Sequence, residues 1–188
     1  MFERGFKSWC EKYSTDTRIE LGLESHSPLD AWVLAKRLRV RVLTPNDITL
    51  DTVTRNILLR NDGTTPSCWS AVTVVVGEKV VVVLNSSHSA ARQASDLTHE
   101  LAHRIRGHVA EEVEVTPEGL LLLKRYDQVQ EEEADWLSGC LLLPRDALMA
   151  IKRQKLDDVE AAARYGVSQK MLSYRMAMTG VNRQFVRT

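Results

Sequence analysis

The motif His99-Glu100-Leu101-Ala102-His103 constrains the fold more than any other feature of the 188-residue sequence. From Ser89 to Ile105 the apolar residues recur at helical spacing, and the pattern stops at Gly107, a residue type that commonly ends helices. Residues four apart on a helix lie only about 40° apart around its axis. The sequence therefore predicts a helix over 89–105 that presents both imidazoles on the same side.

Two imidazoles at this spacing are typical ligands of a zinc ion. Neutral imidazole nitrogens bind zinc at about 2.0–2.1 Å, and a catalytic site usually adds a third protein ligand and leaves the fourth position to water. Glu100 would lie beside that water and accept its proton during attack on a peptide carbonyl. The motif predicts His99 and His103 as zinc ligands and Glu100 as the general base, with Mn²⁺ as the alternative ion.

The third ligand is expected from an acidic run downstream of the motif. A second long helix is predicted over 127–143, where a proline stops it. On this helix Glu131 and Asp135 lie four residues apart and share a face. We assign Glu131 to the metal, and Asp135 to the free ring N–H of a histidine ligand, whose tautomer it would fix. Glu133 is the reserve ligand if the helix is rotated from this assignment.

Other candidates for the site carry weaker arguments. The metzincin class would need a histidine six residues after His103. Val109 stands there, so this class is excluded. His108 follows the predicted helix end and is expected to be a surface residue. An oxyanion-stabilising side chain is not assigned, because Tyr126 and His108 are both more typical of surface or packing positions.

The strand signals point to a small sheet. Trp69 to Val76 and Lys79 to Leu84 are two β-branched runs, and Gly77-Glu78 between them suits a tight hairpin turn. The segment from Arg39 to Leu43 alternates charged and apolar residues, which predicts a half-buried strand at a sheet edge. With the helices this indicates an α+β fold.

Two further helices are predicted before the hairpin. Residues 2–13 suit a short amphipathic helix. A second one is expected from Pro28 to Leu38, with Pro in its first turn and Leu29, Trp32 and Val33 on one face.

Several stretches of the chain match one family pattern. The acidic run reads Glu131-Glu132-Glu133-Ala134-Asp135 and leads to Leu141-Leu142-Leu143-Pro144. Trp69-Ser70-Ala71, Asn85 and Arg92-Gln93 accompany the HExxH motif. In these stretches the chain resembles the ImmA/IrrE family of metallopeptidases over roughly residues 18–181. It departs from the usual pattern at Leu143, where the family has Met, and at Trp136-Leu137-Ser138. Both departures concern packing and not chemistry.

The resemblance implies a zincin-like core, with a small antiparallel-containing sheet packed on the HExxH helix and a second helix supplying Glu131. It further implies a zinc-dependent endopeptidase whose substrate is a regulatory protein. Family members characteristically cleave helix-turn-helix transcriptional repressors, so a repressor is the expected partner.

A basic segment follows the predicted core of residues 1–150. Residues 151–188 contain eight Lys or Arg and three Asp or Glu, and Val159 to Leu172 reads as helix, glycine turn and a second helix capped by Ser168. This predicts a helix-turn-helix-like segment. If it bound DNA, the groove would be contacted by Gln169, Lys170, Ser173 and Tyr174, and the phosphates by Arg164 and Arg175.

We favour a substrate-docking or purely structural helical pair over DNA binding, because a lone helix-turn-helix with a charge near +5 binds DNA weakly. The alternatives to an endopeptidase are a DNA-binding regulator and an antitoxin-like binding module, each with a non-catalytic zincin core. Lys and Arg balance Asp and Glu at 25 each, so the overall charge favours no partner class. The N-terminus lacks an apolar signal stretch, and Cys10, Cys68 and Cys140 suggest reduced thiols, which predicts a cytoplasmic protein without a membrane partner.

Overall fold

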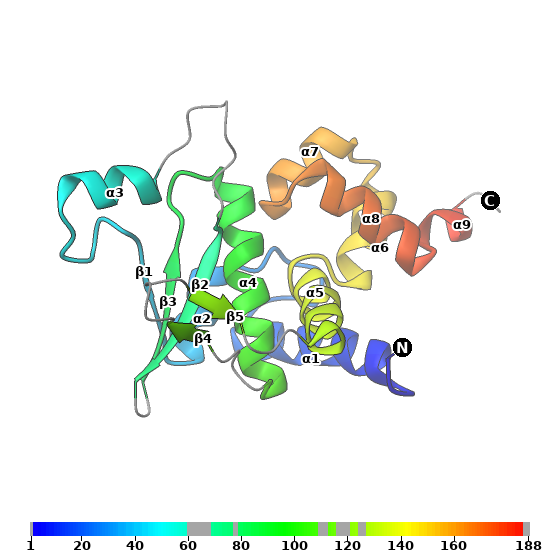
Figure 1. Cartoon of the computed structure of the whole chain (residues 1–188). Helices are drawn as coiled ribbons and strands as arrows, with labels where there is room; N and C mark the ends of the chain where they lie inside the picture. Colours follow the sequence, from blue (N-terminus) through cyan, green and yellow to red (C-terminus); the bar gives the residue numbers. More distant parts are fainter. Residues whose placement is uncertain are drawn as a thin grey trace.

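The computed structural model describes residues 2–59, 69–76, 79–108, 113–115, 121–123 and 127–185. They form a mixed α+β fold with a small three-stranded sheet and a majority of helices (Figure 1). Cys10 and Cys140 are buried free thiols, whereas Cys68 lies outside the described residues. Within the described ranges, no helix combines the length and the apolar character needed to cross a bilayer.

The sheet contains β1 (Val40–Leu43), β2 (Ala71–Val76) and β3 (Lys79–Leu84) in the order β1-β3-β2. β2 and β3 pair antiparallel, which confirms the predicted hairpin, although its turn at Gly77-Glu78 lies outside the described residues. β1 runs parallel to β3 at an edge of the sheet, as its alternating pattern predicts. A second antiparallel pair, β4 (Val113–Val115) with β5 (Leu121–Leu123), was not predicted.

The motif helix α4 (Ala90–Arg106) covers one face of the sheet and confirms the predicted helix. Ser89 caps its first turn by accepting a hydrogen bond from the backbone of Arg92, and Gly107 ends it in the left-handed region at φ 68°. Its fully buried Leu97 and Leu101 join the core to which β3 contributes alternate side chains.

Helix α5 (Gln128–Leu142) packs on the other side of α4, so that α4 lies between the sheet and α5 (Figure 1). Asp127 caps its first turn, and the helix ends before Pro144, as predicted. From Ala134 onward almost every residue is buried, which explains why the second half of this helix is apolar around most of its surface rather than on one stripe. Only its first two turns reach solvent.

Helix α1 (Phe6–Glu20) is longer and begins later than the predicted 2–13 segment. Gly5 precedes it in the left-handed region, which sets the start. The helix continues because Arg18 is fully buried and donates hydrogen bonds to Ser14 Oγ and to the Leu141 carbonyl, both at 2.7 Å. Burial lowers the pKa of Arg18 to about 10, so its guanidinium stays protonated at neutral pH.

Helix α2 (Ala31–Arg37) begins after Asp30, whose side chain caps it, rather than at Pro28. The predicted apolar face was wrong in part: Leu29 is buried, but Trp32 is 42% and Val33 47% exposed. The helix instead buries Leu34 and neighbouring alanines, because its contacts are with β1 and α4.

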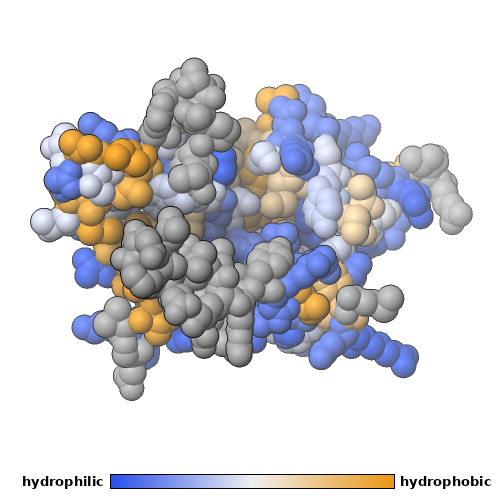
Figure 2. Space-filling model, viewed as in Figure 1, coloured by the Kyte–Doolittle hydropathy of each residue, from blue (hydrophilic) through white to orange (hydrophobic). Residues whose placement is uncertain are grey.

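Helix α3 (Thr52–Leu58) was not predicted from the sequence. Asp51 caps it, and none of its residues is buried. Val53 and Ile57 are 69% and 67% exposed, and Figure 2 shows the apolar surface that gathers over this helix. Because none of its residues is buried, its sequence lacks the apolar stripe by which a helix that packs on a core is predicted.

The C-terminal helices are α6 (Arg145–Gln154), α7 (Asp158–Tyr165), α8 (Gln169–Thr179) and α9 (Val181–Phe185). Gly166 ends α7 in the left-handed region, and Ser168 caps α8, as predicted. These helices share their own apolar core, which also includes Leu142 and Leu143. This second core thus contains residues on both sides of position 150. The predicted division into residues 1–150 and 151–188 stays a prediction.

Arg175 was wrongly assigned to DNA phosphates. Its side chain is fully buried and bridges α8 to α1, with Nη2 2.7 Å from Glu11 Oε1 and Nε donating to the Leu143 carbonyl at 3.1 Å. The same Glu11 carboxylate accepts the backbone N–H of Arg145 at 2.8 Å. The arginine therefore anchors the C-terminal helices to the core. The other residues named for DNA contact are exposed: Gln169, Lys170, Ser173, Tyr174 and Arg164.

Replacing Arg175 with alanine should lower the free energy of unfolding by about 3 kcal/mol, because it leaves the Glu11 charge and the Leu143 carbonyl unpaired. Urea unfolding of the full chain measures this change. The exposed Arg164→Ala variant is the matched control, with an expected change within about 0.5 kcal/mol. Equal destabilisation by both substitutions would contradict the anchoring role.

Candidate metal centre

Three side-chain atoms from α4 and α5 converge at one point. His99 Nε2 lies 3.1 Å from Glu131 Oε2, and His103 Nε2 lies 3.2 Å from Glu131 Oε1. The two Nε2 atoms are 3.0 Å apart. The structure thus brings together the three residues that the sequence analysis assigned to the metal, and their ligand atoms all lie within 4.8 Å of one another.

These separations fit a bound divalent cation. Two ligands with bonds of about 2.0–2.1 Å at tetrahedral angles lie about 3.3 Å apart, close to the separations seen here. The His99, His103 and Glu131 side chains are 23%, 23% and 26% exposed, so the cluster is partly open to solvent. The cluster could therefore hold a metal ion, and two imidazoles with one carboxylate are a donor set that zinc accepts.

The two imidazoles differ in their affinity for protons. Burial lowers the pKa of His99, but the hydrogen bond and charge of Asp135, with the charges of Glu131 and Glu100, outweigh it and raise the pKa overall. Burial lowers the pKa of His103 to about 4, helped by the neighbouring His99 and His108. His103 is therefore neutral at physiological pH, the form in which imidazole binds metals.

Glu100 contacts the edge strand of the sheet. Its Oε2 accepts a hydrogen bond from the hydroxyl of Thr73 in β2. Burial raises the pKa of Glu100, and the Thr73 hydrogen bond and the His99 charge oppose that rise. A raised pKa suits a carboxylate that must take up and release a proton near neutral pH.

Thr73 was not predicted from the sequence as a site residue. Its signal is that it is the one polar residue in the run from Ala71 to Val76. Only the packing of α4 on the sheet shows that this hydroxyl meets Glu100.

Asp135 contacts the cluster, whereas Glu133 does not belong to it. Asp135 Oδ1 is 3.0 Å from His99 Nδ1, the ring nitrogen that faces away from Glu131. Glu133, the reserve ligand, is outside the cluster and instead pairs with Arg106 at 2.7 Å. Tyr126 lies outside the described residues.

The expectation that His108 is a surface residue was wrong. Its side chain is 7% exposed, and its Nδ1 lies 2.9 Å from His103 Nδ1. The reason is the backbone turn at Gly107, which returns the chain onto the last turn of α4.

Replacing Asp135 with alanine should weaken zinc binding about tenfold, the low end of the usual effect for a residue that orients a histidine ligand. The low end applies because the Asp135 side chain is 76% exposed and water can replace its hydrogen bond. Competition with a chromophoric chelator measures the affinity. Glu132→Ala, on the same helix and exposed, is the control and should bind zinc like the wild type.

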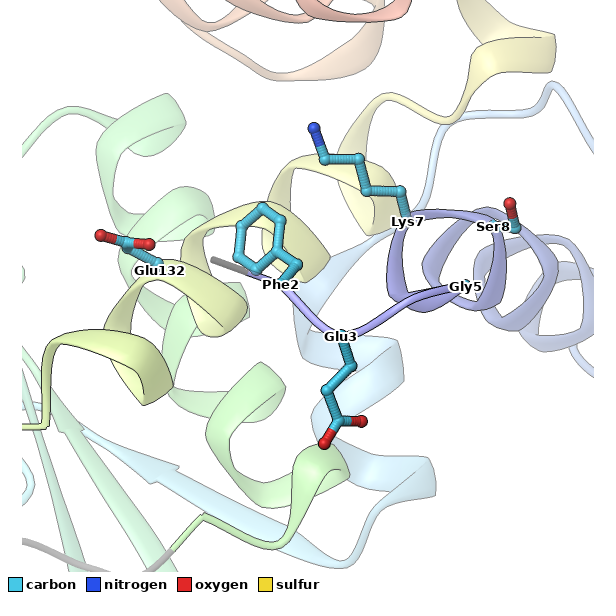
Figure 3. Close-up of a pocket in the computed structure, with 6 residues that line it drawn as sticks. All are labelled: Phe2, Glu3, Gly5, Lys7, Ser8 and Glu132. Carbon is cyan, nitrogen blue, oxygen red and sulfur yellow. The ribbon is translucent and has the colours of Figure 1, made fainter.

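A pocket of about 410 Å³ lies near the start of α1 (Figure 3). Its lining combines Phe2, Glu3, Gly5, Lys7 and Ser8 with Glu132 of α5. It includes neither histidine of the cluster nor Glu131. The pocket is therefore separate from the metal centre.

Comparison with known proteins assigns the chain to a family. Residues 69–177, more than half of the chain, match the model of the IrrE N-terminal-like domain, a peptidase family. The match includes the hairpin, α4, α5 and most of α8. No curated protein and no solved structure matches the chain. The protein therefore belongs to the ImmA/IrrE family of metallopeptidases.

Proposed function

We propose that the protein is a zinc-dependent endopeptidase that cleaves a regulatory protein, with His99, His103 and Glu131 as zinc ligands. The convergence of these three side chains within 4.8 Å carries the proposal. Family membership supports the reaction class, because the family is one of metallopeptidases. A cytoplasmic location stays a prediction from the sequence.

The chemistry divides between the ion and Glu100. A bound zinc ion would supply a Lewis acid that acidifies water and polarises the scissile carbonyl. Glu100 accepts the proton that the attacking water loses and returns it to the leaving amine. Thr73 orients the carboxylate by donating to its Oε2, which leaves Oε1 free of that hydrogen bond for the proton transfer. Asp135 holds the His99 ring through Nδ1.

The sheet edge supports an extended peptide as substrate. Among the described strands β2 pairs with β3 on one side only, so its other edge can pair with a peptide strand. Thr73 links this strand to Glu100, which puts a peptide bound there beside the general base. The outward-facing Val72 and Val74, 49% and 42% exposed, offer apolar contacts to its side chains.

The identity of the substrate rests on the resemblance, which favours a helix-turn-helix repressor. A DNA-binding regulator is the alternative. It is supported by the exposed basic and polar residues of α7 and α8, and weakened by the burial of Arg175.

The test uses the zinc-loaded full chain and a helix-turn-helix repressor encoded beside its gene. We expect cleavage at one or a few bonds, identified by mass spectrometry of the products. A chelator should stop the reaction, and added zinc should restore it. Intact repressor together with sequence-specific retardation of DNA would favour the regulator instead.

A further inference from the structure

The last turn of α4 brings a third histidine to the metal centre without pointing it at the ligand cluster. Gly107 adopts φ 68°, and the backbone N–H of His108 donates to the His103 carbonyl at 3.1 Å. This bond closes the reversal that typically follows a glycine at a helix end. It folds His108 back along the helix, so that its ring meets the ring of His103.

A continuous set of contacts runs from His103 away from the cluster. His103 Nδ1 lies 2.9 Å from His108 Nδ1, and His108 Nε2 lies 3.3 Å from Glu133 Oε2. Arg106 donates to the same carboxylate oxygen, from Nε at 2.8 Å and from Nη2 at 2.7 Å. The His108 and Glu133 side chains are only 7% and 8% exposed, so water has little access to compete for these bonds.

The chemistry of the contacts fixes where the protons are. His103 Nε2 faces Glu131, and a nitrogen that binds a metal carries no proton, so a metal-bound His103 has its proton on Nδ1. His108 Nδ1 must then accept this proton's hydrogen bond, which puts the His108 proton on Nε2. From there it donates to Glu133, whose negative charge is paired with the Arg106 guanidinium.

We propose that His108 is a positioning residue for the metal ligand His103, with Glu133 and Arg106 fixing the His108 tautomer. The inference rests on the proposed metal site. It gives the two histidine ligands different supports: His99 has the largely exposed Asp135 carboxylate directly on its Nδ1, whereas His103 has the His108 ring, which is backed by the ion pair of Glu133 with Arg106. Arg106 is itself held over the rings of Phe6 and Trp9, each at 5.0 Å. This contact connects the set of residues from His103 through His108 and Glu133 to Arg106, here called the relay, to α1.

Nuclear magnetic resonance of the zinc-loaded wild-type chain tests the proton positions directly. Long-range nitrogen–proton correlations should show His103 protonated on Nδ1, and His108 protonated on Nε2 alone. A purely structural His108 has no need of this tautomer. A proton on His108 Nδ1 would overturn the proposal.

Zinc affinity of two His108 variants provides the second test, by competition with a chromophoric chelator. His108→Leu removes the acceptor and should weaken zinc binding about 10- to 100-fold. In His108→Asn the side-chain oxygen can still accept from His103, so binding should stay within about threefold of the wild type. The control is His26→Leu, in which the lost ring is partly exposed and pairs with Glu24. Equal affinity of His108→Leu and the wild type, or equal loss in both His108 variants, would refute the relay.

The same experiment separates this inference from the proposed function. A wild-type chain that binds no zinc would overturn both. A wild-type chain that binds zinc, with a folded His108→Leu variant that binds it equally well, would overturn only the role of His108. If His108→Leu does not fold, the asparagine variant and the tautomer of the wild type still decide the matter.

Discussion

Glu100→Gln should slow cleavage strongly while zinc stays bound. The amide keeps the size of the side chain and can still accept the Thr73 hydrogen bond, but it cannot take a proton from water. General base catalysis typically contributes about 10²- to 10⁴-fold to a rate, and the variant should lose a factor in that range. Product formation from the repressor, followed by mass spectrometry alongside the zinc content of the same sample, measures both properties.

The control for this variant is Glu132→Gln, which makes the same chemical change on the exposed side of α5, where Glu132 contacts Gln128. It should cleave like the wild type. Retention of cleavage by Glu100→Gln within about tenfold of the wild type would assign the base to another group.

Glu131→Ala should remove the metal itself. Among the described residues, Glu131 is the carboxylate that faces both Nε2 atoms, and the two histidines alone make an incomplete ligand set. Loss of an outer residue costs about 10- to 100-fold in affinity, so loss of a direct ligand should cost more than about 100-fold. Elemental analysis after dialysis against a chelator of known affinity measures the loss, and cleavage should stop with it.

Glu133→Ala distinguishes the two carboxylates that were candidates for this role. Glu133 bonds to Arg106 and His108 rather than facing the Nε2 pair, so its removal should weaken zinc binding far less than removal of Glu131. Retention of the metal by Glu131→Ala together with its loss in Glu133→Ala would reverse the assignment and make Glu133 the ligand.

The features that the sequence predicts well are local. Helix α4 follows from apolar spacing between Ser89 and Gly107, and the hairpin follows from two β-branched runs around a glycine. The shared face of Glu131 and Asp135 follows from a spacing of four on one helix, and their contacts with His99 need only that α4 and α5 pack together.

The features that it misses depend on distant partners. The length of α1 is set by Arg18, which bonds to the carbonyl of Leu141. Arg175 looks like a surface charge until its bond to Glu11, 164 positions away, is known. His108 is misread for a different reason: a left-handed glycine reverses the chain, and helical periodicity says nothing about residues beyond the end of a helix.

The burial of α5 bears on how the ion is held. Its second half is fixed inside the core, and Glu131 lies about one turn before the buried stretch, so the position of the carboxylate is set by packing rather than by a loop. α4 holds both imidazoles in the same way through Leu97 and Leu101. Such a preorganised site requires no folding of the chain at the moment of binding, unlike a zinc finger, whose polypeptide is unstructured without its ion. Loss and recovery of a bound metal should thus switch the proposed peptidase activity off and on while the architecture of the protein persists.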